Sequence, residues 1–242
     1  MHSIKINDKE YYLRSDFSEL TQSELLKVAF IRSQHLDFSK LSQIEFNAIR
    51  IVAFKELSNV PLKIINQIKA VEWVDLLEYV NWVFKSPTLK ENLLPKIKKR
   101  FRTFVGPIGM LDKSTMEEMT QADTAFTSFT NQKDVEKLYL LTAILYRPIR
   151  KDLAEFQQST KWNGDMREPL NMTKAKARIK LFKRVPMHIH VAILLYFWSF
   201  RETKLMPFKR VFKVSESNQG TNRGWAGTML EMAHLPVFGN IN

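Results

Sequence analysis

One stretch of the sequence, Pro186 to Leu205, constrains the fold of this chain more than any other. Every residue from Val191 to Phe200 is apolar except Ser199. A helix that is apolar on all sides must be covered by protein on all sides. A membrane-spanning helix needs about 20 apolar residues, whereas charged residues begin here at Arg201. The stretch is therefore predicted to be the central buried helix of a soluble domain.

The composition agrees with a helical protein that has a substantial core. The chain has 242 residues, of which 45% are hydrophobic, and only seven are glycine and nine proline. This hydrophobic share argues against disorder, and the scarcity of turn residues favours long helices over many short strands. We therefore expect a mainly α fold, a multi-helix globular domain with a small N-terminal β-hairpin.

The hairpin is predicted from two short runs of alternating polarity. Ile4 and Ile6 precede the polar residues 7–10, and Tyr11 and Leu13 follow them. Such a pattern is typical of two strands joined by a turn. A lone hairpin is marginal in water, so we expect it to lie against the helices.

Three capping boxes predict where helices begin. They lie at Thr21–Glu24, Ser42–Glu45 and Ser114–Glu117. In this motif a hydroxyl accepts a hydrogen bond from the amide three residues on, and the acidic side chain reaches back. The motif predicts helix starts and carries no chemistry of its own.

The domain organisation follows from composition along the chain. One helical domain with the hairpin is expected over residues 1–214, and a sub-boundary could lie near 86–113. Residues 215–224 contain no apolar side chain, which predicts a flexible linker. Residues 225–242 are predicted to form a C-terminal docking helix and tail.

Nothing in the sequence predicts a catalytic, cofactor or metal site. There is no cysteine, which excludes disulfides and thiolate chemistry. Phosphate-binding glycine loops and a serine nucleophile elbow are also absent. His188 and His190 could bind a metal on a strand, but on a helix this spacing points them to opposite faces. We therefore expect a non-enzymatic protein without a cofactor. The N-terminus has no secretory pattern, and no membrane association is expected.

The net charge of +12 predicts attraction to nucleic acid, acidic membrane surfaces or acidic proteins. Basic residues form three clusters, and Phe101, Phe104, Phe182, Phe208 and Phe212 lie among them. Cations that contact phosphates, combined with aromatic rings that stack on bases, are typical of single-strand binding grooves. The alternative is an ordinary solvated face with the phenylalanines buried in a core. The candidate residues for binding nucleic acid or an acidic partner are Lys96, Lys98, Lys99, Arg100, Arg102, Lys174, Lys176, Arg178, Lys180, Lys183, Arg184, Lys209, Arg210 and Lys213.

Three stretches of the chain together carry a resemblance to a protein family. The first is IKINDKEY at residues 4–11, with Asp8 where glycine is usual. The second runs from Gly106-Pro107 through Met116 to Phe126, and the third from Gly224-Trp225 to Phe238-Gly239. In these stretches the chain resembles the opening, middle and close of helical tail-morphogenesis proteins of tailed phages and prophages, often discussed as tail assembly chaperones.

The resemblance implies a non-enzymatic tail assembly or virion-associated protein that acts through contacts with other phage structural proteins. Its partners would be tape-measure or tail and neck components, met in the host cytoplasm during assembly, and whether it stays in the virion is left open. A chaperone of this kind needs an apolar groove for amphipathic helices. Trp225, Met229 and Met232 could dock such a helix, since methionine adapts to varied partners, or could be ordinary core. The alternative function is a basic nucleic-acid-binding protein, packaged or associated with DNA. The oligomeric state is not predicted.

Overall fold

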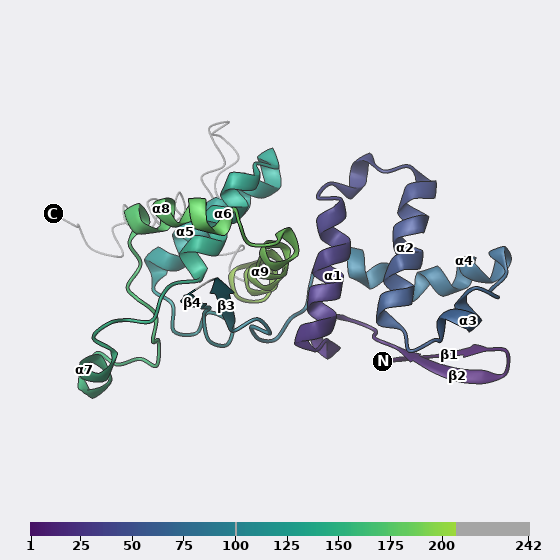
Figure 1. Cartoon of the computed structure of the whole chain (residues 1–242), viewed down its shortest axis with the longest axis horizontal. Helices are drawn as coiled ribbons and strands as arrows, with labels where there is room; N and C mark the ends of the chain where they lie inside the picture. The colour runs from purple at the N-terminus through teal and green to yellow at the C-terminus, as the bar shows by residue number, and fades with distance from the viewer. Residues whose placement is uncertain (100, 207–242) are drawn as a thin grey trace. The chain divides into compact units, whose positions relative to one another are not determined.

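The structure, a computed structural model, describes residues 1–99 and 101–206 (Figure 1). The chain is mainly α-helical, with a small antiparallel hairpin at its N-terminus, as the sequence predicts. None of the helices in these residues is long and apolar enough to cross a membrane. The predicted linker 215–224 and docking helix 225–242 lie outside the described residues.

The chain divides into two compact units. The first unit comprises Met1–Leu94 and Pro186–Ser199, and the second comprises Pro95–Val185 and the chain from Phe200 onward. The chain passes from the first unit to the second after Leu94. The sequence did not predict that the buried apolar helix, residues 186–199, belongs to the first unit. A local pattern does not show which distant segments a helix contacts.

The N-terminal hairpin has a shorter turn than the polar residues of the sequence indicate. Strands β1 (His2–Ile6) and β2 (Lys9–Leu13) pair antiparallel, so the turn consists of Asn7 and Asp8 alone. Both turn residues have positive φ, which Asn and Asp tolerate and which matches the twist of the strands. The four apolar side chains of the predicted inner face are all buried, which fixes the register.

The first two long helices begin at the predicted capping boxes. α1 (Gln22–Gln34) follows Thr21, and α2 (Gln43–Leu57) follows Ser42. In each box the hydroxyl accepts from the amide of the glutamate three residues on, and that glutamate accepts from the amide of the cap. These bonds satisfy amides that a helix start leaves without partners. Just after α2, Asn59 exchanges hydrogen bonds with β2 and so attaches the hairpin to the helices.

Short helices complete this part of the first unit. α3 (Leu62–Ile65) and α4 (Ala70–Glu78) are followed by the 3-10 turn η3 (Asn81–Phe84). Arg32 of α1 donates to two backbone carbonyl oxygens at the end of this turn, both at 3.1 Å. Burial lowers the pKa of Arg32 to about 10, so it remains charged at neutral pH. Two further 3-10 turns are η1 (Phe17–Glu19) and η2 (Phe38–Lys40).

The predicted burial of the apolar helix is confirmed. This helix is α9 (Met187–Phe200), and its apolar stretch is buried throughout except for Trp198, which is half-buried. Within the first unit, the guanidinium of Arg32 lies 5.5 Å from the centre of the Trp198 ring. The one polar side chain of the stretch, Ser199, accepts a hydrogen bond from the amide of Leu89 at 3.1 Å. The hydroxyl is therefore satisfied despite its burial.

The second unit is built around two helices joined by a short turn. α5 (Met116–Gln132) and α6 (Val135–Leu145) pack against each other, and α8 (Met172–Phe182) packs against α6. The other elements of this unit are β3 (Lys96–Lys99), β4 (Arg102–Val105), α7 (Leu153–Gln158) and the π-helical turn η4 (Arg201–Leu205).

The third predicted capping box is wrong by one residue. The sequence favours Ser114 as the cap, but Thr115 holds this position and accepts a hydrogen bond from the amide of Glu118 at 3.2 Å. The carboxylate of Glu118 does not complete a box, because it turns inward and is only 1% exposed. Two arginines bind it there, and this stronger interaction replaces the return bond of a capping box.

The burial of α9 predicts the effect of a charge placed within it. We expect Leu195→Asp to abolish folding of the first unit, because Leu195 is fully buried and an unpaired buried carboxylate costs several kcal/mol. This cost is a large part of the roughly 5–15 kcal/mol that stabilises a domain. The control is Leu62→Asp, which makes the same change at a leucine that is 65% exposed. Circular dichroism melting should show a folded control and an unfolded Leu195→Asp variant; equal melting of both would contradict the burial.

Candidate nucleic-acid interface

The positive charge of the chain is not shared between the two units. In the first unit the acidic and basic residues are equal in number, so the whole net charge of +12 lies in the second unit. Charge confined to one unit produces a stronger local field than the same charge spread over the whole chain. The second unit therefore carries the excess of positive charge.

A second hairpin, which the sequence analysis missed, carries the first basic cluster. In β3 and β4, Ile97 pairs with Phe104, and both side chains are buried. Lys96 and Lys98 point to the opposite face and are exposed, because neighbouring residues of a strand alternate. The alternation of Lys96, Ile97 and Lys98, followed by the strand-forming residues 103–105, was the available signal. It covers only four residues per strand, which is too short to exclude a helix.

α8 carries the second basic cluster, and its exposed lysines lie on a different side of the helix from Arg178. Lys176, Lys180 and Lys183 follow one another at steps of four and three residues, so they lie on the same side of the helix, and all three are exposed. Arg178 points the other way, and its Nη1 lies 3.8 Å from an oxygen of Glu168. Among the described residues, Lys176 and Lys180 form no ion pair and Lys183 pairs with Glu136, whereas Arg178 is used within the fold.

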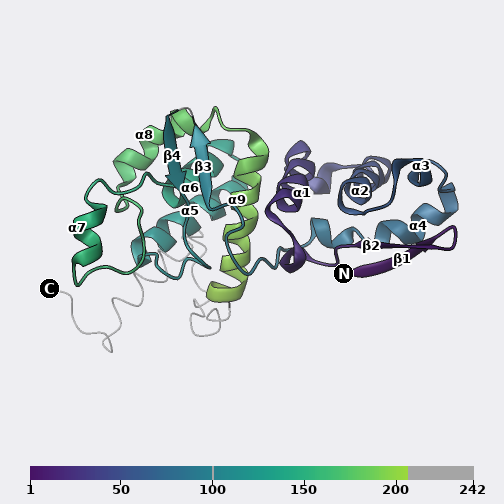
Figure 2. The same ribbon diagram turned by 60° about the horizontal axis from the view of Figure 1, so that its bottom comes forward.

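The hairpin and the end of α8 meet, so one end of the first cluster contacts one end of the second. The side chain of Lys99 donates a hydrogen bond to the carbonyl oxygen of Arg184, and the rings of Phe104 and Phe182 are 5.0 Å apart. Figure 2 shows β3 and β4 beside α8. Lys99 and Arg184 are separated by 85 positions in the sequence. We call the following residues the basic surface: Lys96, Lys98, Lys99, Arg102, Lys176, Lys180, Lys183 and Arg184.

The remaining candidate residues fall into four groups. Phe104 and Phe182 are buried core residues and cannot stack on bases. For these two rings, the alternative prediction of phenylalanines buried in a core is the correct one. Phe101, in contrast, is fully exposed at the tip of the hairpin. Lys174 lies in the first turn of α8, where it lines a pocket. The candidates outside the described residues are Arg100, Phe208, Lys209, Arg210, Phe212, Lys213, Trp225, Met229 and Met232.

A buried network of ion pairs supports the basic surface from within the second unit. Glu118 accepts a hydrogen bond from Arg147 at 2.9 Å and another from Arg167 at 2.6 Å. Asp165 supplies a second carboxylate, 2.8 Å from Arg167 and 3.6 Å from Arg147. Two carboxylates thus offset two guanidinium groups that burial would otherwise destabilise. The sequence analysis missed this network, because its partners lie 29 and 49 positions apart and follow no periodicity.

The same network positions both elements of the basic surface. The backbone of Arg147 pairs with Val105 of β4, with N–H···O distances of 2.8 and 3.1 Å. Arg167 also donates to the backbone at the end of α6, at 2.8 Å. The next residue, Glu168, is the ion-pair partner of Arg178 in α8. The hairpin is therefore attached to one arginine of the network, and α8 is attached next to the other.

The charges of the network shift pKa values in directions that follow from their neighbours. Burial alone would raise the pKa of Asp165, but hydrogen bonds from Arg167 and its positive charge outweigh burial and hold this pKa below its usual range. Burial lowers the pKa of Arg147 and of Arg178. Arginine nevertheless remains protonated in proteins. The network is therefore a set of fixed charges, which suits a structural role.

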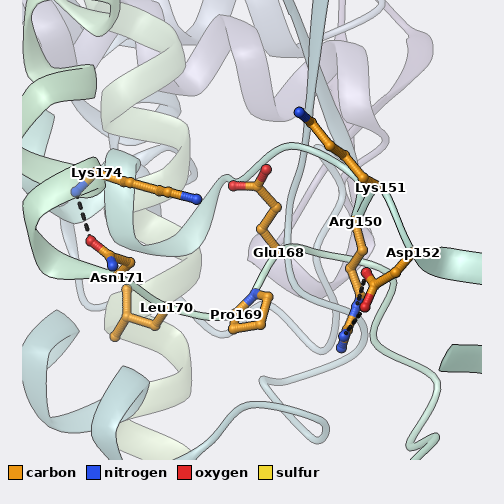
Figure 3. A pocket seen from close by; sticks show the side chains of 8 residues that line it. All are labelled: Arg150, Lys151, Asp152, Glu168, Pro169, Leu170, Asn171 and Lys174. Carbon is orange, nitrogen blue, oxygen red and sulfur yellow. Dashed lines mark hydrogen bonds and ion pairs between the residues drawn. The ribbon is translucent and has the colours of Figure 1, made fainter. Parts of the chain in front are cut away.

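A pocket of about 370 Å³ lies beside the N-terminus of α8 (Figure 3). Arg150 and Asp152 form a two-bond ion pair within it, at 3.0 and 2.8 Å. Lys174 and Glu168 point toward one another across it (Figure 3). Because two carboxylates share this pocket with three cations, it offers little net attraction to an anion. Its lining residues are Arg150, Lys151, Asp152, Glu168, Pro169, Leu170, Asn171 and Lys174.

Other kinds of site find no support in the part of the chain that the structure describes. No group of three or more histidine or acidic side chains in residues 1–99 and 101–206 could hold a metal ion. His188 and His190 lie on α9, where their spacing directs them apart. Comparison with protein-family models, curated proteins and solved structures finds no match for this chain. The geometry of the basic surface is therefore the basis for a functional proposal.

The buried network predicts a difference between two neighbouring glutamates. We expect Glu118→Gln to destabilise the second unit by about 3–5 kcal/mol, because it removes the carboxylate that both buried guanidinium groups share and leaves Asp165 alone to offset two charges. Glu117 is exposed on the same helix, so Glu117→Gln should change stability by about 0.5 kcal/mol or less. Urea unfolding followed by circular dichroism measures both changes. Equal stabilities for the two variants would show that Glu118 is not needed to compensate the arginines.

Proposed function

We propose that this protein binds nucleic acid through the basic surface of its second unit. The observation that carries the proposal is the contact between Lys99 and Arg184, which joins two basic clusters that are far apart in the sequence. A joined surface can contact several successive phosphates, whereas separate clusters would each contact only a few. Binding through phosphates requires no particular base sequence.

The cations of the basic surface are largely free to bind phosphates. Among the described residues, none forms an ion pair with Lys96, Lys98, Lys176 or Lys180. Lys183 does pair with Glu136, but both side chains are well exposed and such a pair is weak. The absence of an ion pair at a single lysine does not distinguish a binding residue from an ordinary solvated lysine. The argument for binding is therefore their position on adjoining elements of a unit that carries the entire net charge.

Charge reversal on α8 tests this proposal. We expect Lys176→Glu combined with Lys180→Glu to weaken binding of a labelled 20-nucleotide strand by roughly tenfold or more at low salt. The slope of log affinity against log salt should fall by about 1.4, since each lost phosphate contact of a single strand removes about 0.7. Fluorescence anisotropy between 50 and 200 mM salt, concentrations over which such affinities change steeply, measures both quantities.

The matched control reverses two exposed lysines of the first unit. Lys55→Glu combined with Lys63→Glu changes the net charge by the same amount outside the basic surface, so affinity and slope should remain close to those of the unchanged protein. Equal weakening by the two pairs would show attraction to net charge rather than to the basic surface. A protein that binds no strand at 50 mM salt would contradict the proposal altogether.

A second candidate is the protein-contact function implied by the resemblance to tail-morphogenesis proteins. One observation favours it, the exposure of aliphatic side chains on two helices of the first unit. Leu62 on α3 is 65% exposed, and Val71 and Val74 on α4 are 74% and 67% exposed. Val71 and Val74 are three positions apart and therefore share one face of α4. Such a face suits an apolar partner helix, for example from a tape-measure, tail or neck protein met in the host cytoplasm or kept in the virion.

Cross-linking tests this second candidate in cells that assemble the particles encoded with this chain. Lys63 and Lys69 flank the exposed aliphatic residues and should cross-link to a phage structural protein. Val71→Ser combined with Val74→Ser should remove these cross-links without lowering the melting temperature, because both side chains are exposed. Cross-links that persist in this variant, or that never include a phage structural protein, would contradict the candidate.

A further inference from the structure

The tip of the β3–β4 hairpin carries an unusual side chain for its position. Phe101 is 103% exposed, as much as in an extended chain. Phe104, Phe126, Phe129 and Phe182 of the same unit are each no more than 4% exposed. Turns between strands favour glycine, asparagine and aspartate, so hairpin geometry does not call for phenylalanine here. Phe101 adds nothing to the core and leaves a large apolar ring in water.

The surroundings of Phe101 are cationic. Lys99 and Arg102 form the last residue pair of the hairpin before its tip, and Lys99 contacts the backbone of Arg184 at the end of α8. Lys183 is exposed in the same region. An exposed aromatic ring between cations is the combination that proteins use to hold a base by stacking while its neighbouring phosphates are neutralised.

We infer that Phe101 stacks on unpaired bases and gives the basic surface a preference for single-stranded over duplex nucleic acid. This inference rests on the nucleic-acid binding proposed above. Every base of a single strand has a free face for a ring to cover, whereas the bases of a duplex already stack on each other and must be separated first. The phosphate contacts attract both forms, and Phe101 distinguishes them.

An anionic membrane is the other partner that a cationic tip with one aromatic ring could meet. Stable insertion into a membrane requires a larger apolar face or a second anchor. Here the residues next to Phe101 in the strands are Lys99 and Arg102, and the next cross-strand pair is Lys98 with Thr103. A single apolar ring surrounded by charged and polar side chains favours a base over the interior of a bilayer.

Two substitutions at Phe101 separate stacking from simple apolar contact. Phe101→Leu keeps an apolar side chain but removes the ring, and Phe101→Trp keeps an aromatic ring. We expect Phe101→Leu to weaken binding of a 20-nucleotide single strand by about tenfold and to leave binding of the matching duplex unchanged. Phe101→Trp should keep the preference for the single strand. The salt dependence should be the same in all three proteins, because neither substitution changes a charge.

The measurement is fluorescence anisotropy of the labelled strand and of its duplex, and the control is Tyr12→Leu, which removes an exposed aromatic ring from the first unit. All variants should melt like the unchanged protein, since Phe101 and Tyr12 are exposed. A strand that contains 2-aminopurine adds a direct signal, because its fluorescence is quenched when a ring stacks on it. We expect this quenching with phenylalanine or tryptophan at position 101 and its loss with leucine.

Different failures have different meanings. If the unchanged protein binds neither strand nor duplex, the proposed function itself fails. If it binds both equally and Phe101→Leu leaves their ratio unchanged, the stacking inference is overturned while phosphate binding stands. Equal weakening of strand and duplex by Phe101→Leu also overturns it, because the ring would then serve both forms. Binding to vesicles of phosphatidylcholine and phosphatidylserine that depends on Phe101, without a preference for single strands, would assign the tip to a membrane.

Discussion

The compensation of the buried carboxylate of Glu118 by two arginines is the interaction on which the second unit depends. A charged group inside a protein is tolerated only if opposite charges and hydrogen bonds replace the water it has lost. Arg147 comes from the chain just after α6, and Arg167 comes from the loop before α8. Helix α5, the end of α6 and this loop must therefore all be in place together, which makes the arrangement specific as well as stable.

This network determines how the two elements of the basic surface, the β3–β4 hairpin and α8, are positioned. Arg147 serves twice, since its side chain binds Glu118 while its backbone pairs with β4. The residue after Arg167 fixes α8 through Arg178. Two surface elements that are distant in the sequence are thus held by neighbouring members of one buried cluster. Their contact between Lys99 and Arg184 follows from the interior of the unit, and the exposed lysines need not attract each other to meet.

The sequence predicts those features whose partners lie close together along the chain. The capping boxes at Thr21 and Ser42 and the inner face of the first hairpin involve residues a few positions apart, and α9 is recognised from its continuous apolar stretch. α5 is capped by Thr115 and not by the expected Ser114, and no box is completed there because two arginines distant in the sequence bind Glu118. The network and the meeting of the clusters depend on contacts across tens of residues, for which one sequence offers no pattern.

Arginine and lysine play different parts in the second unit, although both contribute the same positive charge to the sequence. A guanidinium is planar and weakly hydrated, so arginine suits buried pairing with carboxylates and carbonyl groups, whereas the strongly hydrated ammonium of lysine suits an exposed position. The second cluster follows this rule, with Arg178 turned inward and Lys176, Lys180 and Lys183 turned outward. Arg102 and Arg184 depart from this rule, because both are exposed. Both lie near the hairpin tip, where Arg102 pairs with Lys99 and the carbonyl oxygen of Arg184 accepts a hydrogen bond from Lys99. Planar groups that can bind phosphates with two hydrogen bonds, or lie flat on a base, are therefore presented beside Phe101, the one fully exposed aromatic ring among the described residues of this unit.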